Sequence, residues 1–154
     1  MKLIKANLND AQNLWKMQVE AFSELYERYN DTETSPTTEK IDKTIHRLSD
    51  PDTSYYYITV DNNIVGAIRV ADPIDKSIRK RISPLFIMPE FRNKGYAQKA
   101  MTLAEEIHGS NHWELITILE EKGNCHLYEK MGYHKTGEQI VVNDKMTLVF
   151  YNKD

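Results

Sequence analysis

The sequence has little of what several classes of protein depend on. Its 154 residues include one cysteine, Cys125, which excludes an internal disulfide and a zinc site built from several cysteines. No apolar run approaches the roughly 18 residues that a membrane-spanning helix needs. The 20 Lys and Arg residues are scattered and are outnumbered by 23 Asp and Glu residues, so we expect no nucleic acid partner. The histidines lack a spacing typical of metal ligands, and we expect no metal. Because residues 1–5 turn polar at once, we expect no signal peptide, no membrane partner and a cytoplasmic location.

The amino-acid composition is that of an ordinary globular protein. With 40% hydrophobic and 28% charged residues, the chain suits one domain with its own core, and we expect a single domain over residues 1–154. Apolar spacing and turn residues predict strands at 3–8, 54–60, 63–70, 78–88, 113–119, 133–137 and 146–152. The same signals predict four helices: from Asn9 to at least Leu25, between Ser35 and Pro51, over residues 97–107, and over residues 124–131.

Two details inside the predicted strands carry structural information. Pro84 has no N–H group to donate, so a strand that passes through it must contain a bulge or an unpaired side. Tyr55, Tyr56 and Tyr57 follow one another, and successive strand residues point to opposite faces of a sheet. We therefore expect at least one of the three phenols to face away from the core.

The most informative stretch covers residues 85–97. An apolar run stops at Pro89, a polar loop follows, and from Ala97 onward apolar residues recur with helical spacing. The start of a helix has unpaired N–H groups and a favourable dipole for anions, while Gly95 lets a ligand approach the backbone and Arg92 and Lys94 add positive charge. The loop therefore suits a phosphate, although neither GxxxxGK[ST] nor GxGxxG is present, which disfavours a kinase or a dehydrogenase. The alternative is a tight turn at Gly95 with solvated basic residues.

Two segments carry a resemblance to a known family. Arg92-Asn93-Lys94-Gly95-Tyr96-Ala97 resembles the [R/Q]-x-x-G-x-[G/A] signature of the GNAT superfamily of N-acetyltransferases, and residues 127–133 (LYEKMGY) resemble its late LYEKxGF segment. The resemblance implies an α/β fold with a mixed, mostly antiparallel central sheet of about seven strands, flanked by about four helices. It also implies that two central strands splay apart beside Pro84. The order of the predicted elements agrees with this fold across nearly the whole chain.

The same resemblance implies how acetyl-CoA is held. It assigns the pyrophosphate to the backbone amides of the loop and the following helix turn, beside Arg92. It assigns the pantetheine arm to the backbone of the splayed strand. The cofactor-binding residues expected on this basis are Leu85, Phe86, Ile87, Arg92, Asn93, Lys94, Gly95, Tyr96, Ala97 and Gln98, with Asn124 added below.

Tyr128 matches the tyrosine that serves as general acid in the family. Its free pKa of about 10 keeps the proton at neutral pH, so it can protonate a departing thiolate; the alternative is a ring that packs in the core. Many members carry an asparagine seven residues ahead of this tyrosine, where this chain has Glu121. Asn124 lies one helical turn before Tyr128 and can still reach the cofactor. Glu120 and Glu121 are candidates for the base that deprotonates the amine, or they are solvated loop acids.

Residues 24–33 combine acids with two tyrosines, Tyr26 and Tyr29, which we expect to bind a cationic substrate unless they form a solvated face. The sequence thus predicts an acetyl-CoA-dependent N-acetyltransferase that moves an acetyl group directly to a primary amine, favouring a small cationic molecule. Two alternatives are an acetyltransferase that acts on protein amines and a non-catalytic module that binds or senses acyl-CoA. A homodimer is left open, since dimers are common among the proteins that the sequence resembles.

Overall fold

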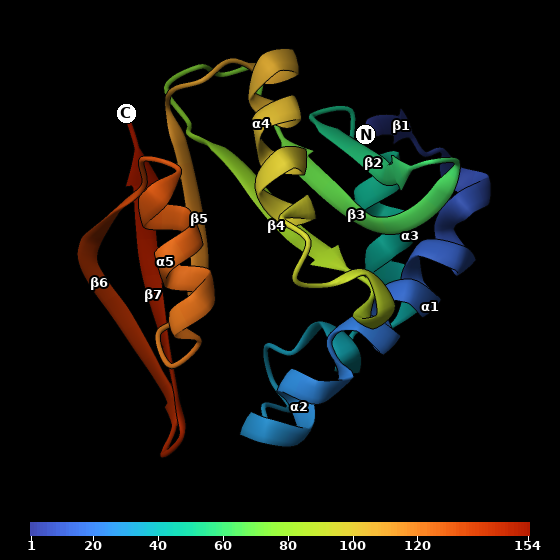
Figure 1. Cartoon of the computed structure of the whole chain (residues 1–154). Coiled ribbons are helices and arrows are strands. Elements are labelled where there is room, and N and C mark those ends of the chain that lie inside the picture. The colour runs from blue at the N-terminus through green and yellow to red at the C-terminus, as the bar shows by residue number, and fades with distance from the viewer.

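The structure is a computed structural model that describes all residues of the chain, 1–154. It contains seven strands and five α-helices, with three short 3-10 turns at Leu8–Asp10, Pro36–Thr38 and Pro89–Phe91 (Figure 1). In chain order the elements are β1 (Lys2–Lys5), α1 (Ala11–Ala21), α2 (Ser23–Tyr29), α3 (Ile41–Ser49), β2 (Thr53–Val60), β3 (Asn63–Ala71), β4 (Lys80–Ile87), α4 (Tyr96–His108), β5 (Trp113–Ile118), α5 (Lys122–Lys130), β6 (His134–Asn143) and β7 (Met146–Lys153).

The strands form one sheet in the order β1-β2-β3-β4-β5-β7-β6. Every neighbouring pair is antiparallel except β4 and β5, which are parallel. The predicted mixed, mostly antiparallel sheet of seven strands is therefore confirmed. No helix of the structure has the length and apolar character that crossing a bilayer requires.

The two central strands separate as predicted. Strands β4 and β5 pair only at Lys80 with Trp113 and Arg81 with Glu114, and then diverge, so that Figure 1 shows an opening between the two parts of the sheet. The register of β4 against β3 shifts opposite Pro84, since Ile82 pairs with Val70 and Leu85 pairs with Ile68. The extra residue is the bulge that a proline without an N–H group requires. Beyond Arg81, the edge of β4 that faces β5 has no strand partner.

Both faces of the sheet are covered. One buried cluster joins the sheet to α4 and α5 and includes Trp113, Met101 and Tyr151, and a second joins it to α1 and includes Leu14. Tyr56 belongs to the first cluster, whereas Tyr55 and Tyr57 belong to the second, and all three are at most 7% exposed. The expectation that one phenol faces away from the core was wrong, because the sheet has a core on each side.

The first predicted helix is two helices, which makes five instead of about four. The break lies at Phe22, whose ring packs edge-on against Phe86 with the centroids 5.7 Å apart. In a continuous helix the Ala21 carbonyl would accept the N–H of Leu25. Here it accepts Nη2 of Arg92 instead, at 2.6 Å. A contact with a residue far along the chain therefore ends α1 and gives α2 its own direction.

Three other boundaries differ from the prediction. Strand β1 stops at Lys5 because Asn7 caps the turn that follows, accepting the N–H of Asn9 at 2.9 Å. Ser35 caps only the 3-10 turn after it, and α3 begins later, at Ile41. Strand β6 continues to Asn143, since Gly137 with φ 93° forms an irregularity in the pairing with β7 and does not end the strand.

Candidate active site

The loop between β4 and α4 presents a row of unpaired backbone donors. Asn93 and Gly95 have φ values of 64° and 76°, which turn the chain into the helix that starts at Tyr96. The first amide of this helix with a backbone acceptor is that of Lys99, which donates to the Gly95 carbonyl at 3.2 Å. The N–H groups from Asn93 to Gln98 donate to no group of the protein. Six consecutive free amides at a helix N-terminus can bind the two phosphates of a diphosphate.

The loop borders a cavity of about 550 Å³, which we call the cofactor cavity. The space at Gly95 is open, since a Cβ atom placed there would meet no atom within 4 Å. Lys94 is exposed and does not line the cavity, but every other predicted cofactor residue does: Leu85, Phe86, Ile87, Arg92, Asn93, Gly95, Tyr96, Ala97, Gln98 and Asn124. Sequence reasoning thus brought together the residues of one cavity.

Arg92 makes contacts that the sequence did not predict. Its Nη2 donates to the Ala21 carbonyl at 2.6 Å, its Nε donates to the Ile87 carbonyl at 2.9 Å, and its Nη1 lies 3.5 Å from a carboxylate oxygen of Glu24. The guanidinium therefore connects the end of α1 to the end of β4. It supports the loop between β4 and α4, which we call the phosphate loop, from within the protein. The Ile87 carbonyl already accepts a hydrogen bond from Arg92.

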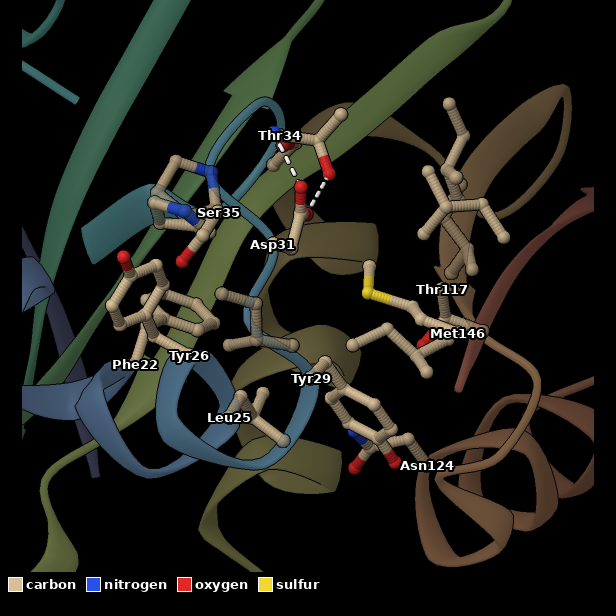
Figure 2. Close-up of a pocket in the computed structure, with 18 of the residues that line it drawn as sticks. Phe22, Leu25, Tyr26, Tyr29, Asp31, Thr34, Ser35, Thr117, Asn124 and Met146 are labelled. Atoms are coloured by element: carbon tan, nitrogen blue, oxygen red, sulfur yellow. Dashed lines mark hydrogen bonds between the residues drawn. The ribbon is translucent and has the colours of Figure 1, made fainter. Parts of the chain in front are cut away.

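A second cavity, of about 260 Å³, opens between α2, the loop after it, and strands β4, β5 and β7 (Figure 2). We call it the acceptor cavity. Both tyrosines that the sequence assigned to the substrate, Tyr26 and Tyr29, line it. Most of the remaining wall is apolar and includes Leu25, Ile82 and Met146.

The two cavities are adjacent. Five residues line both of them: Phe22, Leu25, Leu85, Asn124 and Tyr128. Phe22 and Leu25 belong to the α2 region, Leu85 to β4, and the other two to α5. A molecule in the cofactor cavity and a molecule in the acceptor cavity would therefore both lie against Tyr128.

Tyr128 is suited to hold a proton at this junction. Its ring packs edge-on against Tyr133 and Tyr151, with centroids 6.3 and 6.4 Å away. Burial raises the pKa of Tyr128 to about 12, so the hydroxyl stays protonated well above neutral pH. The hydroxyl of the neighbouring Tyr151 donates a hydrogen bond to Glu129 at 2.6 Å, whereas the Tyr128 hydroxyl makes no such bond within the protein.

Glu121 does not face the acceptor cavity directly. Its Oε2 accepts the hydroxyl of Tyr29 at 2.5 Å and Nη1 of Arg28 at 2.6 Å, and the residue lines the cofactor cavity. Burial, followed by the bond to Glu121, raises the pKa of Tyr29. The predicted substrate residue and the predicted base are thus bonded to each other. Glu120 is used elsewhere, because its Oε1 accepts the backbone N–H of Thr147 at 2.8 Å.

Asp31 is a site residue that sequence reasoning did not single out. It lines the acceptor cavity and is 3% exposed. In the sequence it is one of several acids among residues 24–33, as is Glu33, which is exposed in the structure. The signal that could have found it is its residue type before the turn at Ser35-Pro36, because the short aspartate side chain can accept the backbone N–H group two residues further on.

The chain is similar to one protein family and to several solved structures. A family model described as the acetyltransferase (GNAT) family matches residues 12–133. No curated protein matches the sequence. Solved structures do match over almost the whole chain. The spermidine N-acetyltransferase of Vibrio cholerae in complex with CoA and spermine is 17% identical, with a TM-score of 0.72, covering 97% of this chain and 92% of that one.

Two further structures are similar at the same level. The PaiA N-acetyltransferase of Thermoplasma acidophilum, in complex with coenzyme A, is 14% identical with a TM-score of 0.70, covering 99% of this chain and 98% of that one. The microcin C7 self immunity acetyltransferase MccE, in complex with acetyl-CoA and AMP, is 14% identical with a TM-score of 0.70, covering 97% of this chain and 89% of that one. At these identities the similarity establishes the fold.

Proposed function

The chain belongs to the GNAT family of acetyltransferases, enzymes that use acetyl-CoA, and on that premise we propose that it acetylates the primary amine of a small cationic molecule. The observation that carries the proposal is the junction of the two cavities at Leu85, Asn124 and Tyr128. Each cavity supplies one reactant, and the junction brings them together.

This arrangement supports direct transfer within a ternary complex. Acetyl-CoA supplies an acetyl group activated as a thioester. The chain offers no cysteine nucleophile at the junction: Cys125 is 6% exposed, its Sγ lies 3.6 Å from the Ile118 carbonyl, and it lines neither cavity. The amine is therefore the group that attacks, and no acyl-enzyme is needed.

Three parts of the chain would divide the remaining work. The free amides from Asn93 to Gln98 bind the diphosphate, with Lys94 adding positive charge from the surface. The unpaired edge of β4 at Leu85 and Phe86 binds the pantetheine arm. The Tyr128 hydroxyl donates its proton to the departing sulfur.

Glu121 remains our candidate for the base, acting through Tyr29. The Tyr29 hydroxyl already donates to Glu121, and its ring lines the acceptor cavity. An amine beside Tyr29 can pass a proton to the phenol oxygen while the phenol proton moves to the carboxylate. Arg28 donates to the same carboxylate oxygen at 2.6 Å, and the proton then passes from Glu121 to solvent.

The acceptor cavity favours a small molecule over a protein amine. A volume of about 260 Å³ suits a slender chain, and the aromatic rings of Phe22, Tyr26 and Tyr29 attract a cation. The similarity in fold to an N-acetyltransferase of spermidine is consistent with this class. A non-catalytic binding module is disfavoured, because it would not need a free phenol where the two cavities meet.

A panel of amines tests the proposal. Release of thiol from acetyl-CoA is measured with polyamines, aminoglycosides and lysine-containing peptides. We expect turnover with the small cationic amines. Turnover with peptides alone would favour a protein substrate. Thermal stabilisation by coenzyme A without turnover on any amine would favour the binding module.

Two further predictions accompany this function. We propose that the enzyme acts in the cytoplasm, where a single unpaired cysteine stays reduced. Sedimentation or scattering in solution would test whether the chain forms a homodimer.

A further inference from the structure

The acceptor cavity contains a single charged residue. Of the residues that line it, none is Lys, Arg or His, and Asp31 is the one acid. Its carboxylate is almost fully buried, at 3% exposure of the residue. A buried carboxylate without a cation is unfavourable, because it has left water without gaining an opposite charge. The cavity therefore has a negative charge that its own walls do not neutralise.

The carboxylate is held by three hydrogen bonds and can accept one more. Its Oδ1 accepts the backbone N–H groups of Glu33 and Thr34 at 3.1 and 2.9 Å, and its Oδ2 accepts the Thr34 hydroxyl (Figure 2). A carboxylate offers about four acceptor positions. Three are used by the loop, so one position on Oδ2 remains for a ligand, and the loop fixes where that oxygen lies.

Asp31 lies away from the reaction centre. Leu85, Asn124 and Tyr128 line both cavities, whereas Asp31 lines the acceptor cavity alone. In Figure 2, Asp31 lies with Thr34 on one side of the cavity and Asn124 lies on the other. The wall between them is mostly apolar. A ligand that fits this order has a cation, an apolar spacer and then the reacting amine.

We propose that the acceptor is an aliphatic amine with a second cationic group, such as a linear diamine or polyamine, and that Asp31 binds the cation that is not acetylated. This proposal rests on the proposed function. At the near amine the C–N bond forms as the C–S bond breaks, that amine loses a proton and the sulfur gains one. The distal ammonium keeps its proton and donates it in a hydrogen bond to Asp31.

The test compares linear diamines of increasing length with monoamines of the same length, using the unaltered protein, Asp31→Asn and Glu33→Gln. Asparagine retains the oxygen that accepts the two loop amides, so the loop keeps its shape. Glu33→Gln removes an equal charge from an exposed position in the same loop. We expect Asp31→Asn to raise KM for diamines by about tenfold to a hundredfold, as loss of a charged hydrogen bond does, with kcat retained. Monoamine kinetics should stay unchanged, and Glu33→Gln should match the unaltered protein.

Calorimetry with a diamine in the presence of coenzyme A gives a second readout, in which Asp31→Asn should weaken binding by the same factor. If Asp31→Asn failed to fold, the length series in the unaltered protein would decide, because a distal anchor predicts a KM minimum at one diamine length that monoamines lack. Equal effects of Asp31→Asn on diamines and monoamines, or no effect on either, would overturn the role of Asp31 while thiol release still upheld the acetyltransferase. Absence of thiol release with every amine would instead overturn the proposed function.

Discussion

Substitution of Gly95 tests whether the free amides bind a diphosphate. A Cβ at this position points into open space, so a side chain there enters the region where the phosphates would lie. A φ of 76° strains most residues other than glycine. With Gly95→Val, loss of coenzyme A binding could therefore not be distinguished from misfolding. Asparagine and aspartate tolerate this conformation best and have the same shape. The pair Gly95→Asn and Gly95→Asp therefore separates the effect of bulk from the effect of charge.

The expected size of the charge effect follows from Coulomb's law. A carboxylate about 4 Å from a phosphate charge, at an effective dielectric constant of about 20, costs about 4 kcal/mol. This corresponds to a loss of about a thousandfold in affinity for coenzyme A. Gly95→Asn lacks the charge, so we expect it to weaken binding far less. Each variant should lower Tm by only about 2–4 °C for each kcal/mol of backbone strain.

Isothermal titration with coenzyme A measures both variants, and a melting curve confirms that each is folded. Gly137→Asp is the matched control, because Gly137 also has a positive φ (93°) and open space around a Cβ, but it lies in β6 outside both cavities. If folded Gly95→Asp bound coenzyme A as tightly as the unaltered protein, the diphosphate would not lie at these amides and the cofactor assignment would be wrong.

Three other predictions concern the junction and its support. Tyr128→Phe should lower kcat by about a hundredfold or more, as loss of a general acid does, with affinity for coenzyme A unchanged in titration; full turnover would contradict its role. Because the pKa of Tyr128 is raised to about 12, its proton is lost only at high pH, so kcat should stay level up to pH 10. A tyrosine with the ordinary pKa of about 10 would be half ionised there and would lose about half the rate. Arg92→Lys should lower the free energy of unfolding by about 1.5–3 kcal/mol, since one of the two charged hydrogen bonds to carbonyls is lost, and should raise KM for the amine as α2 moves; an unchanged melting temperature and KM would argue against this supporting role.

The fold and the cofactor loop could be predicted because their signals are local. An apolar run, Pro89, a polar loop with Gly95 and a helical repeat follow one another within a few turns of chain. The number of free amides at a helix start depends on backbone geometry, which Gly95 and the spacing already specify. Strand β4 likewise had to be irregular at Pro84, whatever lay beside it.

The acceptor cavity could not be predicted in the same way. Its walls come from α2, β4, β5, α5 and β7, and their relative positions depend on tertiary contacts. Asp31 and Glu33 look alike in the sequence, yet one is 3% exposed and the other lies on the surface. Arg92 lies beside Gly95 and resembles a phosphate ligand, but its closest partner is a carbonyl 71 residues away. Where a side chain could make several kinds of contact, the tertiary structure determines which contact forms, and the neighbouring residues in the sequence do not.

Helix α2 shows how such contacts determine the site. The helix buries only Tyr29, so apolar packing alone does not hold it. Arg92 fixes its start by bonding the Ala21 carbonyl. Its end is fixed by the bond from Tyr29 to Glu121 and by Asn143, whose Nδ2 donates to the Tyr29 carbonyl at 2.8 Å. The start is thus tied to the phosphate loop, while the end is tied to α5 and β6 across the opening in the sheet. Because residues of this region line both cavities, the polar contacts at its two ends would set where an amine lies relative to Tyr128 in the proposed complex.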